Sequence, residues 1–184
     1  AGTTHYISKA TMGEMGKFRT FLQTAIPRQY MRNALYVNTG TPRFMETSFM
    51  SGVASTDWTW AVKLADFDND GHLDAFFSNG VARSFNDSDN ARSVEEHVGQ
   101  NAWDHWEKFP PRKEQNLAFR NLGDLKFQDA SRDWGLDHVG MSYAAATGDI
   151  DGDGDLDLLV ASLDEPVALY RNESQSAGAI GVRL

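Results

Sequence analysis

Two aspartate-rich stretches of identical spacing hold the residues best suited to chemistry. The first loop, residues 66–74, reads D-F-D-N-D-G-H-L-D, and the second loop, residues 149–157, reads D-I-D-G-D-G-D-L-D. Four carboxylates this close repel one another unless a cation lies among them. The spacing therefore predicts a cation site in each loop. Its carboxylate ligands, at positions 1, 3, 5 and 9, are Asp66, Asp68, Asp70 and Asp74 in the first loop and Asp149, Asp151, Asp153 and Asp157 in the second.

Ca²⁺ is the ion that best matches these side chains. It is a hard cation that takes six to eight oxygen ligands in a flexible shell. The glycine at position 6 allows a sharp turn, through which the backbone carbonyl at position 7, that of His72 or Asp155, becomes a further ligand. A single aspartate-rich loop is often only a solvated turn, whereas two copies with one spacing favour two calcium sites.

The flanking residues predict that each loop joins two antiparallel strands. An EF-hand loop has twelve residues, ends in a bidentate Glu and lies between helices. Here the last acid falls at position 9, and the chain continues into the short apolar runs 73–77 and 156–160. Runs of this length are typical of buried strands, and short apolar runs at 61–65 and 144–148 precede the loops. The ion would then fasten a strand–loop–strand unit.

An internal repeat sets the predicted architecture. Asp149 follows Asp66 by 83 residues, and at the same offset N-A-L-Y-V-N-T-G at 33–40 aligns with N-L-A-F-R-N-L-G at 116–123. A third, partial copy begins with A-L-Y-R-N at 168–172. Each unit contains four short strands, which is the pattern of a β-propeller blade. Closed propellers have about four to eight blades, so we expect an all-β, partial propeller of two to three blades that other blades or other protein chains complete.

The repeat divides the chain into five segments. We expect an N-terminal segment at 1–32, a first repeat unit at 33–80, an insertion at 81–115, a second unit at 116–165 and the start of a third at 166–184. Apolar residues at helical spacing predict a short helix that Pro27 ends. Ser93 and Glu96 form a capping box that predicts a helix in the insertion.

Aromatic residues suggest packing or recognition roles. Trp103 and Trp106, in the insertion, either hold it against its blade or form a sugar-stacking surface. T-D-W-T-W at 56–60 precedes the first loop's entry strand, and we expect its aromatic residues to fill space between blades or, less often, to line a pocket.

Composition narrows the function classes. The net charge is −9, and no basic run is present, which argues against nucleic acid and anionic membranes as partners. The sequence has no apolar stretch near 18 residues, so no transmembrane segment is expected. Weak calcium loops are useful where calcium is about millimolar. This favours an extracellular, cell-surface or periplasmic location.

The motifs resemble a known repeat family. The loops, the apolar strands after them and the sequences A-F-R-N-L-G and L-Y-R-N look like FG-GAP/VCBS repeats, the calcium-binding blades also found in the integrin α-subunit propeller. More narrowly, residues 30–172 resemble bacterial proteins of the ASPIC/UnbV-associated (CRTAC-like) type, and A-G-A-I-G-V-R-L resembles the entry to an ASPIC/UnbV domain. The resemblance implies an exported, seven-bladed scaffold whose shared motifs are the metal loops, and it implies no catalytic residues.

Three functions follow as hypotheses. The first is a calcium-binding module of an exported protein that serves as a binding or structural scaffold for protein or glycan partners. The second is a scaffold fragment of an extracellular enzyme, polysaccharide-active or redox. The sequence has no G-x-S-x-G, H-E-x-x-H, P-loop or C-x-x-C motif, but its many carboxylates leave glycoside chemistry open. The third is a structural subunit of a large extracellular or membrane-attached assembly.

Overall fold

The computed structural model describes residues 24, 26, 32–84 and 107–174, and these residues form an all-β structure, as predicted. The predicted N-terminal helix, the helix from Ser93, and Trp103 and Trp106 lie outside the described residues. No helix in the described part is long and apolar enough to cross a membrane. The described strands are β1 (Tyr36–Asn38), β2 (Phe44–Glu46), β3 (Thr59–Ala65), β4 (Asp74–Asn79), β5 (Glu114–Gln115), β6 (Leu117–Asn121), β7 (Phe127–Asp129), β8 (Val139–Gly140), β9 (Ser142–Gly148), β10 (Asp157–Ser162) and β11 (Ala168–Tyr170).

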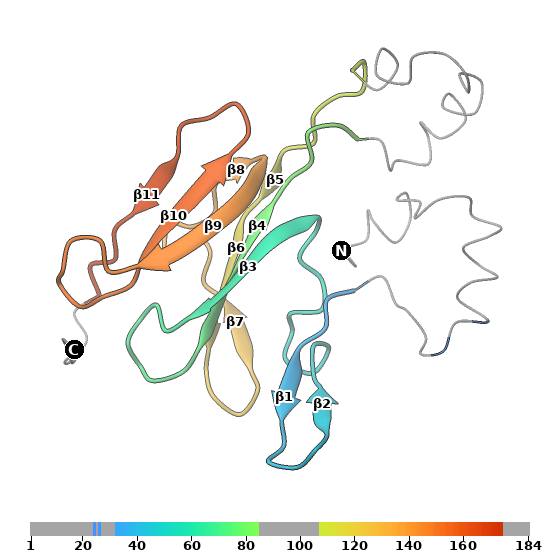
Figure 1. Cartoon of the computed structure of the whole chain (residues 1–184), viewed down its shortest axis with the longest axis vertical. Coiled ribbons are helices and arrows are strands. Elements are labelled where there is room, and N and C mark those ends of the chain that lie inside the picture. The colour runs from blue at the N-terminus through green and yellow to red at the C-terminus, as the bar shows by residue number, and fades with distance from the viewer. Residues whose placement is uncertain (1–23, 25, 27–31, 85–106, 175–184) are drawn as a thin grey trace.

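Two antiparallel sheets dominate the fold. The larger has the strand order β3-β4-β6-β7, and the second has the order β11-β10-β9. Figure 1 shows these sheets beside each other, with both aspartate loops at the same end. The strands β1 and β2 form a separate hairpin, and β5 pairs with β8. This arrangement is that of neighbouring blades in a partial β-propeller.

The blades are offset by two strands from the repeat units of the sequence. The unit 33–80 contributes β1 to β4, but β3 and β4 share their sheet with β6 and β7, which come from the unit 116–165. The reason is the antiparallel pairing of β4 with β6, which continues the sheet across the insertion. The second sheet repeats this order when β11 pairs with β10. A blade therefore begins with the strand before an aspartate loop.

The insertion leaves and rejoins its blade at one point. Val81 and Arg112 form an antiparallel bridge, and the N–H of Ser84 donates to the carbonyl of Pro110 at 3.1 Å. Buried Glu114 accepts a hydrogen bond from the N–H of Trp58 at 2.9 Å. Because β4 runs from the first loop towards Val81, the bridge between Val81 and Arg112 lies at the opposite end of the blade from the loop (Figure 1).

Apolar packing covers both faces of β4. On one face Phe76 belongs to a core cluster with Ala118, Leu158 and Val160, which joins the two sheets. On the other face Phe77 packs edge-on against Phe119 at 5.7 Å between ring centroids. Burial on both faces explains why this strand reads as a continuous apolar run instead of alternating.

An aromatic stack joins the first strands of the two blades. Trp60 of β3 stacks on Tyr143 of β9, with 4.7 Å between ring centroids and 27° between ring planes. The two residues are 83 positions apart and so occupy equivalent places in the repeat. Trp60 therefore packs between blades, as predicted for the T-D-W-T-W stretch.

We predict that Phe76→Ala destabilises the fold far more than Tyr36→Ala. Phe76 is fully buried between the sheets, whereas Tyr36 is 64% exposed. Truncating a buried Phe to Ala costs about 3–5 kcal/mol because it leaves a cavity. Chemical denaturation of both variants measures the difference, and equal losses would contradict the packing described here.

Candidate metal centre

Both aspartate loops connect neighbouring antiparallel strands, as the sequence predicts. The residue pairs Ala65–Asp74 and Gly148–Asp157 are in register and close the two loops. The position-6 glycines adopt left-handed conformations, with φ of 89° at Gly71. A side chain at this position would be strained, which explains the glycine.

A buried aspartate at position 9 anchors each loop. Asp74 accepts the N–H of Phe67 at 2.9 Å on one carboxylate oxygen and the N–H of Asn121 at 2.8 Å on the other. Phe67 belongs to the loop and Asn121 to the third strand of the blade. One side chain thus joins the loop's beginning, its end and strand β6.

The second loop repeats this arrangement. Asp157 accepts the N–H of Ile150 and the N–H of Asn172, both at 2.9 Å. Asp74 and Asp157 are 0% and 1% exposed, so a single pattern of hydrogen bonds satisfies two buried carboxylates in equivalent positions.

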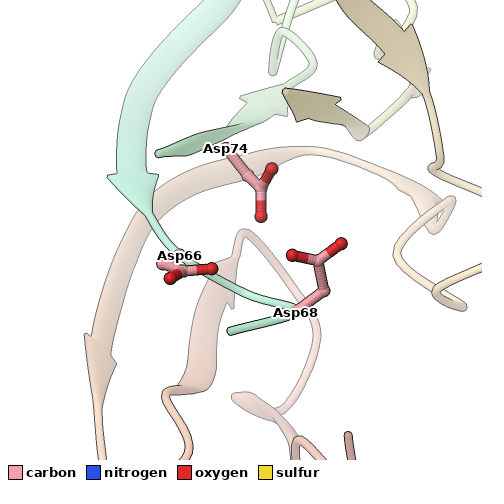
Figure 2. A group of neighbouring side chains, drawn as sticks. All are labelled: Asp66, Asp68 and Asp74. Carbon is pink, nitrogen blue, oxygen red and sulfur yellow. The ribbon is translucent and has the colours of Figure 1, made fainter. Parts of the chain in front are cut away.

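Three carboxylates of the first loop converge. One oxygen each from Asp66, Asp68 and Asp74 lies within 4.8 Å of the others, and Figure 2 shows the three side chains turned towards one another. Asp68 Oδ1 is buried and has no hydrogen-bond partner. Burying a carboxylate oxygen without a partner costs free energy of folding, so this atom is a candidate ligand for a cation. Asp70 lies outside this group, and its carboxylate accepts the N–H of His72 at 2.8 Å.

The second loop brings together a different subset. Asp149, Asp151 and Asp153 each place one oxygen within 4.8 Å of the other two, and all three are exposed. Asp157 lies outside this group and has the anchoring role described above. Taken over both loops, every predicted carboxylate position appears in at least one group. The ligand roles of the His72 and Asp155 carbonyls stay predictions.

An arginine that sequence reasoning missed contacts the position-3 aspartate of each loop. Arg120 Nε lies 2.6 Å from Asp68 Oδ2, and Arg171 Nε lies 2.5 Å from Asp151 Oδ2. The signal was present in F-R-N and Y-R-N, where the Arg precedes the Asn whose N–H binds the position-9 aspartate.

Hydrogen bonds connect the two loops directly. Asn172 Nδ2 donates to the carbonyl of Phe67 at 2.7 Å, and Asn69 Nδ2 donates to Asp155 Oδ1 at 2.6 Å. Ser174 donates to the other oxygen of Asp155 at 3.2 Å. The loops of neighbouring blades therefore form one polar cluster.

The two anchoring aspartates differ in their electrostatics. Burial raises the pKa of Asp74 above its ordinary value, with contributions from the charges of Asp68 and Asp70 and partial compensation from the two amide N–H groups. The N–H groups of Asn172 and Ile150 lower the pKa of Asp157, and the charge of Arg171 adds to this effect. The hydrogen bonds are equivalent, so the two sites differ in the effect of burial and in the neighbouring charges, which are Asp68 and Asp70 at the first site and Arg171 at the second.

Family comparisons agree with these motifs. The FG-GAP-like repeat matches residues 24–77, and the FG-GAP repeat matches residues 141–182. The chain therefore contains an FG-GAP-like repeat and an FG-GAP repeat. Each match contains one aspartate loop and the strand before it, β3 or β9; the first match ends within β4, and the second includes all of β10. Neither the curated proteins nor the solved structures include a significant match to this chain.

We predict that Asp74→Ala destabilises the FG-GAP fold even in chelator. It leaves two backbone N–H groups without their acceptor, and each such loss costs about 1–3 kcal/mol. Asp70→Ala, which removes an exposed carboxylate from the same loop, serves as the control. Denaturation of both variants in chelator separates anchoring from metal binding. An Asp74 variant as stable as the Asp70 variant would contradict the anchoring role.

Proposed function

We propose that the chain is a calcium-stabilised propeller module that serves as a binding or structural scaffold in an exported protein. The carrying observation is the convergence of Asp66, Asp68 and Asp74 on one point, with Asp68 Oδ1 buried and unpartnered. Burial, together with the charges of Asp68 and Asp70, raises the pKa of Asp74, and a cation there would favour its ionised form.

The donor set fits Ca²⁺. Both groups consist of carboxylates alone, without the His or Cys ligands that favour zinc. Ca²⁺ tolerates irregular shells that include backbone carbonyls and water, which suits loops that offer three converging carboxylates each. When bound, the ion supplies positive charge to the loop, while the chain's own residues orient the strands. The residues proposed to hold it are Asp66, Asp68 and Asp74 in the first loop and Asp149, Asp151 and Asp153 in the second, with Asp70, Asp157 and the carbonyls of His72 and Asp155 as further candidates.

Two sheet faces that no described residue covers support the scaffold role and the proposal that other blades or protein chains complete the fold. On β3, Val62 and Leu64 are 49% and 54% exposed and line a cavity of about 300 Å³. On the second sheet, Leu159 of β10 lies opposite Leu169 of β11, and Leu169 is 53% exposed. Leu158 and Val160 of the same sheet pack into the core. In stacked blades such faces are buried by the neighbouring repeats.

The location and the narrower relationship extend the same proposal. Loops that rely on exposed aspartates suit environments where calcium is about millimolar, so we propose an extracellular, cell-surface or periplasmic protein. A relationship to ASPIC/UnbV-associated proteins would match this location. Its sequence marker, A-G-A-I-G-V-R-L, lies outside the described residues. We propose glycans, as well as proteins, as partners of this module.

We predict that calcium raises the melting temperature and that Asp68→Asn removes much of this gain. An ion that binds only the folded state stabilises it by about 2.7 kcal/mol per site at a hundredfold excess over Kd. Asp164→Asn, which removes one exposed charge from a turn outside the loops, is the matched control. Thermal melts in calcium, magnesium and chelator provide the measurement. Melting that does not respond to chelator would refute the calcium proposal.

We further predict that the uncovered faces make the isolated chain self-associate. Leu169→Lys should shift light scattering towards the 20.5 kDa monomer while changing the melting temperature little, because the side chain is already exposed. Leu122→Lys, at a residue 54% exposed beyond the end of β6, is the control and should leave association unchanged. A wild-type chain that stays monomeric up to high concentration would contradict the role of these faces.

A further inference from the structure

The two loops carry equivalent ion pairs in unequal surroundings. In each, the arginine that precedes the Asn bound to the position-9 aspartate contacts the position-3 aspartate, Arg120 with Asp68 and Arg171 with Asp151. Equal sequence positions would predict equal cation binding. The contacts around the arginines show that the loops are not equivalent.

Arg120 is held to one side of the first loop. Its guanidinium lies over the ring of Trp134 at 5.5 Å from the centroid, and it contacts Asp68 through one carboxylate oxygen only. The other oxygen, Asp68 Oδ1, has no hydrogen-bond partner. Among the described ion pairs, Arg120 is the only positively charged side chain that contacts Asp66, Asp68 or Asp74. Asp66 and Asp74, the other two converging carboxylates, therefore have no ion pair with a positively charged side chain among the described residues.

Arg171 instead spans the second loop. Its Nε lies 2.5 Å from Asp151, and its NH2 group lies 3.7 Å from Asp153, so it contacts two of the three converging carboxylates. The arginine side chain is 58% exposed, and no aromatic ring is described over it. The guanidinium thus neutralises part of the negative charge that would attract a cation to the second loop.

We infer that Arg171 is a built-in counter-ion of the second loop, so that the two loops bind calcium with unequal affinity, the first more tightly. The inference rests on the proposed calcium function. A divalent cation entering the second loop must displace or tolerate the positive charge of Arg171, whereas the first loop presents an unpartnered oxygen. The FG-GAP loops then fill in order as the calcium concentration rises.

The order has a structural consequence at the blade interface. The second loop is hydrogen-bonded to the first through Asn69 and Asp155, and Arg171 lies next to Asn172, which donates to Phe67. Without calcium in the second loop, Arg171 holds that loop's carboxylates together in place of the ion. Low calcium would therefore load the first blade and leave the second loop closed by its own arginine.

The test compares Arg171→Gln with Arg43→Gln by calorimetric calcium titration. Arg43 is an exposed residue of the β1–β2 hairpin, so its variant changes the net charge equally without touching either loop. Removing an exposed positive charge that contacts two of the three converging carboxylates should tighten the weaker binding step roughly five- to tenfold. The Arg43 variant should match the wild type.

A second variant assigns the steps to the loops. Asp66→Ala should abolish the tighter step, leaving one weak step that Arg171→Gln tightens in the same background. If wild type binds two calcium ions but Arg171→Gln leaves the weaker step unchanged or weakens it, the inference is wrong and the calcium function stands. If wild type binds no calcium, the proposed function itself fails. If Asp66→Ala does not fold, the comparison of Arg171→Gln with the wild type still tests the inference, because the substitution should tighten only the weaker of the two binding steps.

Discussion

The buried aspartate that closes each loop is the interaction on which the rest of the structure depends. Asp74 and Asp157 each satisfy two backbone N–H groups, one at the start of their own loop and one at the last residue of β6 or just beyond β11. A buried carboxylate is costly unless it is hydrogen-bonded or paired, so the loop, the strand that follows it and the third strand must come together at once. This single contact sets the local geometry of a blade.

The same contact places the remaining acidic residues. With the loop held at both ends, Asp66 and Asp68 lie near Asp74, and the like charges of the three carboxylates repel one another. The loops also connect the blades, since Asn172 reaches the backbone of Phe67. The proposed metal ligands and the hydrogen bonds between blades therefore belong to one polar cluster, and Phe67 of the first loop also belongs to the apolar core formed around Phe76.

Sequence patterns predicted the local units well and their assembly less well. The loops, their antiparallel strands and the blade-like repeat followed from spacing that reflects local backbone geometry. The strand at which each blade begins was not predicted, because β4 pairs with β6 across an insertion. Sequence periodicity alone does not identify the first strand of a sheet. Arg120 and Arg171 were overlooked for a related reason: their partners lie far away in sequence, on the preceding loop.

The most direct test of the account is the number of calcium ions that one chain binds. Titration of the chelator-treated protein, followed by calorimetry, counts the sites without reference to any assumed activity. The account predicts two ions per chain, one for each aspartate loop. A chain that binds none at millimolar calcium would show that the converging aspartates serve only to anchor the strands, and the calcium-dependent part of the account would be wrong.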